Sequence, residues 1–176
     1  MKKKILAVLM AAAMVFGMTA CGGTSNDAGS AAAGGDAAGS GAIGLAVSTQ
    51  NNPFFVTLVE GAQKAADAAG VKLVVTDAGD DAAKQTNDVD DLISKKVSVL
   101  IVNPVDSDAI APAVEDAIAA GIKVIAVDRA VNGVDVDCQI ASDNVKGAEM
   151  ATEYLKSVIG DGAKVAELQG TTGASA

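Results

Sequence analysis

The chain has 176 residues, half of them hydrophobic, and a formal charge of −9 that comes from 22 acidic and 13 basic side chains. This acidic balance, without a basic patch, argues against nucleic acid as a partner. The sequence has no histidine and only two cysteines. These counts exclude a His-based catalytic triad and make a zinc site of His or Cys ligands implausible, so we expect no metal site.

The N-terminal segment 1–20 has the pattern of a secretory signal. Three lysines precede an apolar run, Ile5–Ala20, which is too short to span a membrane and is followed directly by a polar segment. The letters MTAC that end at Cys21 resemble a bacterial lipobox, although a chance cysteine at the end of the apolar run is the alternative. The resemblance implies that Cys21 becomes the lipidated first residue of an exported protein, anchored on the outer face of the cytoplasmic membrane.

Residues 21–41 are predicted to comprise the lipidated Cys21 and a flexible linker. It consists almost entirely of Gly, Ala, Ser and Asp. Such a composition cannot bury enough apolar surface to fold. We therefore expect a tether between the lipidated cysteine and a folded domain.

From residue 42 onward, short apolar runs alternate with amphipathic stretches. Continuous apolar runs of strand length are typical of parallel strands that are buried on both faces. The stretches between them are predicted helices, two of which end at Gly70 and Gly121, while Pro112 lies in the first turn of the third helix. The predicted strands are 42–48, 71–76, 97–103 and 122–127.

This alternation predicts an α/β fold with a doubly wound parallel sheet. A further strand at 137–141, a helix at 144–159 and a strand at 163–169 begin another such unit. We therefore divide the chain into an N-terminal lobe, 42–141, and a hinge with the beginning of a second, incomplete lobe, 142–176. Cys138 is expected to be a small buried side chain within its strand.

Ligands of open parallel sheets bind in the crevice beyond the carboxyl ends of the strands. The polar residues that follow the predicted strands are Ser48 and Asn52, then Asn103, then Asp128 and Arg129. Each has a simpler explanation. Asn52 can cap a helix, Asn103 can be a turn residue before proline, and Asp128 with Arg129 can form a surface ion pair.

Two adjacent aromatic residues, Phe54 and Phe55, start the first predicted helix. Phe55 belongs to the apolar stripe of that helix. Phe54 lies about 100° around the helix from it, so we expect Phe54 to face the crevice. Together with the planar Asn, Asp and Arg groups, an aromatic ring suits a sugar, whose hydroxyls take paired hydrogen bonds and whose C–H face packs on the ring.

The sequence gives little support to an enzyme. It has no G-x-G-x-x-G motif after the first strand, no phosphate-binding loop and no G-x-S-x-G elbow. A secreted α/β hydrolase would need a nucleophile and a base that are not found. We expect binding without turnover and no cofactor.

Several blocks of the sequence resemble the type I periplasmic sugar-binding proteins of ABC transporters. These blocks are AVSTQNNPFFVTLVEGAQKAAD, VNPVDSDAI, VDRAV and IASDNVKGAEMATEYL, followed by GAKVAELQGTTGASA at the end. In that family two α/β lobes close on a monosaccharide about a hinge. The resemblance implies sugar contacts at the polar and aromatic positions named above and a first hinge strand near Ala141–Asn144.

The resemblance also implies a monomeric receptor that delivers ribose or a similar monosaccharide to an ABC permease. Members of the family continue beyond the end of this chain, so the chain is expected to be C-terminally truncated and to hold a half-site that binds weakly. The incomplete second lobe is expected to have exposed sheet edges. We do not expect the chain alone to be a competent receptor.

Alternative ligands for such a receptor are a hexose, a polyol or a sugar-like autoinducer. The sensor core of a lactose-repressor-type regulator shares the fold. Such a regulator carries an N-terminal helix-turn-helix, whereas a predicted signal peptide occupies that place here.

Overall fold

The computed structural model describes residues 41–175. The predicted signal segment, Cys21 and nearly all of the predicted linker lie outside these described residues. Among the residues that the structure describes, no helix is long and apolar enough to cross a membrane.

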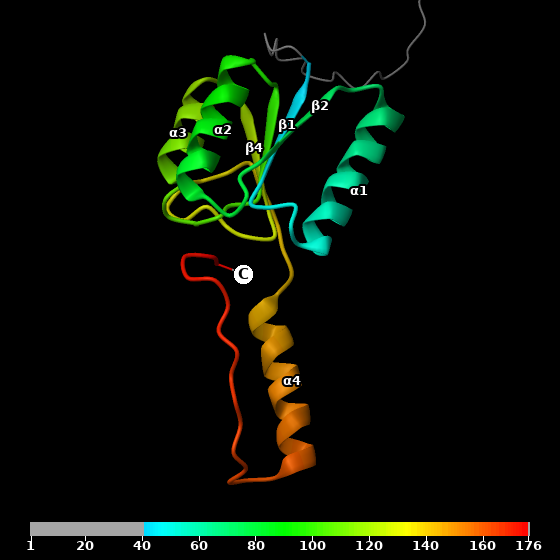
Figure 1. Ribbon diagram of the computed structural model, residues 1–176, viewed down its shortest axis with the longest axis vertical. Helices are drawn as coiled ribbons and strands as arrows, with labels where there is room; N and C mark the ends of the chain where they lie inside the picture. The colour runs from blue at the N-terminus through cyan, green and yellow to red at the C-terminus, as the bar shows by residue number, and fades with distance from the viewer. Residues whose placement is uncertain (1–40, 176) are drawn as a thin grey trace, which may run out of the picture. The chain divides into compact units, whose positions relative to one another are not determined.

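A five-stranded parallel sheet forms the centre of the fold, in the order β2-β1-β3-β4-β5 (Figure 1). The change of direction in this order, with β2 on one side of β1 and β3 on the other, confirms the predicted doubly wound α/β sheet. The strands lie within or close to the predicted apolar runs: β1 (Ile43–Val47), β2 (Leu73–Asp77), β3 (Val99–Val102), β4 (Lys123–Val127) and β5 (Cys138–Ile140).

The two faces of the sheet are covered by different helices (Figure 1). Helix α1 (Pro53–Ala69) lies on one face, and helices α2 (Ala82–Ser94) and α3 (Ala111–Ala119) lie on the other. A fourth helix, α4 (Asn144–Ile159), follows β5 and has no buried residue. All four helices were predicted from the amphipathic stretches.

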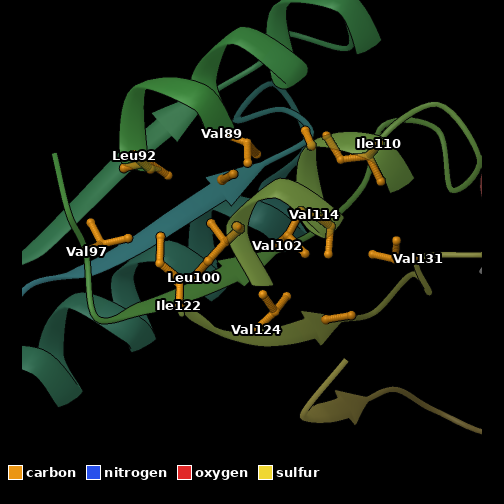
Figure 2. Packing of buried hydrophobic residues seen from close by; sticks show 14 of the residues in the cluster. Val89, Leu92, Val97, Leu100, Val102, Ile110, Val114, Ile122, Val124 and Val131 are labelled. Atoms are coloured by element: carbon orange, nitrogen blue, oxygen red, sulfur yellow. The ribbon is translucent and has the colours of Figure 1, made fainter. Parts of the chain in front are cut away.

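The main apolar core lies between the sheet and helices α2 and α3 (Figure 2). Residues of β1, β3 and β4 that share this face are completely buried. The opposite face is less well covered, because Ile101 of β3 and Ile125 of β4 are only half-buried. The prediction that these strands are buried on both faces is therefore met only by β1. The largest fully buried members of the main core are Leu92, Leu100, Ile110, Val89, Val102, Val114 and Val124.

Local signals in the sequence set the helix ends. The side chain of Asn52 accepts a hydrogen bond from the backbone N–H of Phe54 (3.0 Å), and Pro53 occupies the first turn of α1. Gly70 and Gly121 adopt left-handed backbone conformations, with φ of 66° and 80°, after α1 and α3. Glycine tolerates this conformation without the steric cost that a Cβ atom would bring. The capping and helix-end predictions are confirmed.

Two predictions beyond β4 are wrong. Cys138 lies in a strand as predicted, but it is exposed, because β5 is the edge of the sheet and all three of its residues are exposed. Residues 163–169 form no strand. A strand requires hydrogen bonds to a neighbouring strand, and this segment pairs with none among the described residues.

An ion pair ties the start of β4 to the segment before β5. Lys123 donates a hydrogen bond to Asp137 (2.8 Å), and the same carboxylate accepts the backbone N–H of Val124 (2.9 Å). These two hydrogen bonds favour the charged carboxylate and hold the pKa of Asp137 below its usual value. This pair lies at the end of β4 opposite to the predicted crevice.

Candidate functional site

A cavity of about 510 Å³ lies where the carboxyl ends of the strands were predicted to form a crevice. Its walls come from the segments that follow β1, β2, β3 and β4, and from one residue near the C-terminal end. The lining residues are Thr49, Asn51, Asn52, Phe55, Asp80, Val105, Arg129 and Thr171. Three of the predicted site residues, Asn52, Phe55 and Arg129, are thus brought together in one wall.

Phe55 is the aromatic residue of the cavity wall. Its ring is 3% exposed, and the guanidinium carbon of Arg129 lies 5.5 Å from the ring centroid. Phe54 packs edge-on against Phe55, with 5.2 Å between the ring centroids, but it is 57% exposed and is not part of the lining. Phe55 is buried on the core-facing stripe as expected, whereas Phe54, which was expected to face the crevice, does not line the cavity. At the first turn of α1, a ring on the core-facing stripe also reaches the carboxyl edge of the sheet.

Asp128 sits in an unusual backbone conformation directly after β4. Its φ is 65°, and the N–H of Arg129 donates to the carbonyl of Val127 across it (2.8 Å), which makes a three-residue γ-turn. The left-handed region is unfavourable for a residue with a side chain. Asp128 lies at the same end of the sheet as the cavity but is not one of its lining residues, and Asp80 and Lys96 also have positive φ values.

The turn brings Arg129 back over the segment that follows β3. Its Nη1 donates to the carbonyl oxygen of Pro104 (2.9 Å), and its Nε lies 3.9 Å from Oδ2 of Asp128. The Nε atom is buried and has no hydrogen-bond partner among the described residues. A buried donor without a partner is costly, so an acceptor placed next to this N–H would be stabilising. The side chains of Arg129 and Asp128 are 14% and 26% exposed, so the pair is more buried than the predicted surface ion pair.

Ser48 and Asn103 lie beneath the cavity. Both are completely buried, and Ser48 Oγ donates to Asn103 Oδ1 (2.6 Å). The amide nitrogen of Asn103 donates to the carbonyl of Val127 (3.1 Å) and faces Oδ2 of Asp128 (3.4 Å). These side chains connect the ends of β1, β3 and β4. They support the segments that line the cavity, but neither is a lining residue itself.

Four polar lining residues were not among the predicted site residues. Thr49 and Asn51 come from the segment after β1 and obey the same carboxyl-edge rule as their neighbours. Asp80 follows the outer strand β2, and its backbone N–H donates to the carbonyl of Ser48 (2.8 Å), which holds it next to the cavity. Thr171 lies far along the chain, and no local pattern marks it. The carboxyl-edge rule would have found the first three if applied to every polar residue of each loop.

The chemistry of the cavity suits an uncharged ligand with several hydroxyl groups. The guanidinium of Arg129, the amides of Asn51 and Asn52 and the carboxylate of Asp80 offer both donors and acceptors. The ring of Phe55 offers an apolar surface. Among the described residues, no group of His, Cys, Asp or Glu is placed to hold a metal ion.

Comparison with known families agrees with this arrangement of strands. The model of the family described as periplasmic binding protein domain matches residues 43–176. The chain belongs to this family.

Two curated relatives are named ribose import binding protein RbsB. That of Bacillus subtilis (strain 168) is 52% identical over 134 residues, which cover 76% of this chain and 44% of the relative. That of Escherichia coli (strain K12) is 49% identical over 134 residues, which cover 76% of this chain and 45% of the relative. The chain thus spans less than half the length of these curated relatives.

A solved structure of the family has the same fold. An ABC transporter solute binding protein from Mycobacterium smegmatis with bound glycerol is 39% identical, with a TM-score of 0.71. The match covers 77% of this chain and 47% of that chain. These named relatives are binding proteins of transporters.

Proposed function

We propose that this chain is the substrate-binding component of an ABC importer and that it binds ribose or a similar monosaccharide without converting it. The observation that carries the proposal is the wall of the cavity, where the Phe55 ring and the Arg129 guanidinium lie 5.5 Å apart in a chain 52% identical to a ribose import binding protein. A ring face for C–H groups next to a planar donor for hydroxyls is the combination that a sugar requires.

The proposed contacts divide into two layers. Asn52, Asp128 and Arg129 would hydrogen-bond the hydroxyl groups, and Phe55, extended at the rim by Phe54, would pack on the ring of the sugar. Ser48 and Asn103 contribute from beneath the cavity. We assign these contacts to the lobe 42–141, and we expect segment 142–176, with the hinge near Ala141–Asn144, to contribute to the opposite side of the ligand.

A polyol is the second candidate ligand. It is favoured by the relative whose structure holds glycerol. A hexose or an autoinducer would need the same kind of hydroxyl recognition. A panel of ribose, glucose, glycerol and xylitol therefore accompanies the test below.

Titration of ribose into the full chain, followed by NMR, tests the proposal. We expect shifts of the backbone amides of Asn52, Phe55 and Arg129, because they line the cavity. NMR detects weak binding, which matters because the match spans less than half of the relatives' length. If no ligand of the panel shifts these amide resonances, or any other amide resonance of the chain, the proposed function is refuted.

Replacing Asp128 with glycine is expected to weaken ribose binding at least about tenfold, since a hydrogen bond to a charged group is worth roughly 1.5–3 kcal/mol. Glycine accepts the φ of 65°, so the turn after β4 is retained, and any loss of stability comes from the contacts of the Asp128 carboxylate with Asn103 and Arg129. Calorimetric or NMR titration measures the affinity, and thermal unfolding measures the stability. Asp135→Gly, which removes an exposed carboxylate before β5, is the matched control and is expected to bind normally. Unchanged affinity in Asp128→Gly would remove Asp128 from the site.

We also propose that the protein is exported and anchored through lipid on Cys21. Support comes from the lipobox-like letters before Cys21 and from the periplasmic binding protein family. In cells fed a labelled fatty acid, we expect the wild-type chain to carry the label in the membrane fraction. The Cys21→Ser variant is expected to lose the label, while Cys138→Ser keeps it. Equal labelling of wild type and Cys21→Ser would contradict the anchor.

A further inference from the structure

The side chain of Gln85 is a buried polar group that none of the proposed sugar contacts includes. It lies in the first turns of α2 and is 1% exposed. Its Nε2 donates to the carbonyl oxygen of Asn103 (2.8 Å), and its Oε1 accepts the backbone N–H of Val105 (2.7 Å). One amide thus satisfies the backbone groups on both sides of Pro104, which itself has no N–H to offer.

The segment that Gln85 holds carries several parts of the site. The carbonyl of Pro104, between the two bonds of Gln85, accepts Nη1 of Arg129 (2.9 Å). Val105 lines the cavity, and the side chain of Asn103 connects the ends of β1 and β4. The position of the Arg129 guanidinium therefore depends on a backbone segment whose position is fixed by Gln85.

We propose that Gln85 is a positioning residue of the sugar site. Its amide fixes the segment Asn103–Val105, and the carbonyl of Pro104 in turn fixes the guanidinium of Arg129 over the ring of Phe55. This proposal rests on the proposed function, because it assigns Gln85 to the same site. Gln85 itself does not line the cavity and is not expected to touch the ligand.

A purely structural role makes a different prediction. If Gln85 only satisfied two backbone groups, its loss would destabilise the chain like any other core defect, and the folded molecules would bind as before. If it positions Arg129, its loss moves Arg129 and weakens binding even in molecules that are fully folded. The two roles are separated by measurements on the folded state.

The test uses the full chain and two substitutions at position 85. Gln85→Met keeps the length of the side chain and removes both hydrogen bonds. Gln85→Glu keeps the acceptor for Val105 but places an oxygen against the carbonyl of Asn103. Val89→Ala, one turn further along α2 and completely buried, is the matched control, because it weakens the core and removes no hydrogen bond to the segment around Pro104.

The first measurement needs no ligand. We expect the NMR resonance of the Arg129 Nε–H to shift in Gln85→Met and Gln85→Glu and to stay in place in Val89→Ala. The second measurement is ribose affinity, which is expected to fall about tenfold in Gln85→Met, less in Gln85→Glu, and less than about twofold in Val89→Ala.

The outcomes distinguish this inference from the proposed function. If the wild-type chain binds no sugar of the panel, the proposed function fails, while the Arg129 resonance still decides whether Gln85 positions that side chain. If the wild type binds and both variants keep its affinity and its Arg129 resonance, the inference is overturned. If Gln85→Met does not fold, Gln85→Glu, which retains one hydrogen bond, decides in the same way.

Discussion

The Leu100→Ala variant is expected to lose about 3 kcal/mol of unfolding free energy. Leu100 is completely buried in β3 and points into the core under helices α2 and α3 (Figure 2). Alanine would remove apolar contacts and leave a cavity that the neighbouring side chains fill only in part. Since domains are stable by only roughly 5–15 kcal/mol, the loss should be evident in a urea unfolding curve followed by circular dichroism.

Leu168→Ala is the matched control, because it removes the same atoms from a side chain that is 97% exposed. Its effect is expected to stay below about 0.5 kcal/mol. Equal effects of the two substitutions would contradict the core described between the sheet and helices α2 and α3. The comparison also tests whether the sheet is the stable part of the chain.

The strands and helices up to residue 159 could be predicted because their signals are local. Apolar runs of strand length, amphipathic stretches, the cap at Asn52 and the glycines after α1 and α3 each act within a few residues. The carboxyl-edge rule then places the ends of β1, β3 and β4 side by side, and this brings Ser48, Asn103 and Arg129 into one region. Short-range patterns and one topological rule thus account for three of the eight residues that line the cavity, Asn52, Phe55 and Arg129.

The two errors beyond β4 have a common physical cause. A strand forms only when another strand accepts its hydrogen bonds, and burial depends on what covers a face. The apolar residues of 163–169 and the small side chain of Cys138 indicate only that these segments are able to form a strand or to be buried. Residue type does not show whether a neighbouring strand is present to pair with or whether another element covers the side chain.

Two features of the site could not be predicted from the spacing of apolar residues along the helices. The choice between Phe54 and Phe55 depends on how the first turn of α1 sits against the sheet edge, which the angle around the helix does not determine. Gln85 precedes Val89 by four residues and therefore lies on the buried face of α2, but the spacing does not show which groups its amide bonds. Such side chains become visible only when their hydrogen-bond partners, Asn103 and Val105, are known.

Arg129 is the residue whose replacement is expected to affect binding most. The Arg129→Met variant keeps a long side chain but loses the charge, the hydrogen bond to Pro104 and a buried N–H donor that has no partner among the described residues. Hydrogen bonds to charged groups are worth roughly 1.5–3 kcal/mol, so ribose affinity should fall about 10- to 100-fold. NMR or calorimetric titration of the full chain measures this loss.

Two further variants show which property of Arg129 matters. Lys72→Met removes a cation just before β2, at the amino-terminal ends of the strands and thus away from the cavity. This variant should bind like the wild type, and it controls for a general effect of charge. Arg129→Lys keeps the charge but lacks the planar group that bonds Pro104 while it lies over Phe55. We therefore expect Arg129→Lys to bind almost as poorly as Arg129→Met. Wild-type affinity in Arg129→Lys would show that charge alone is sufficient and that the geometry above Phe55 is not required.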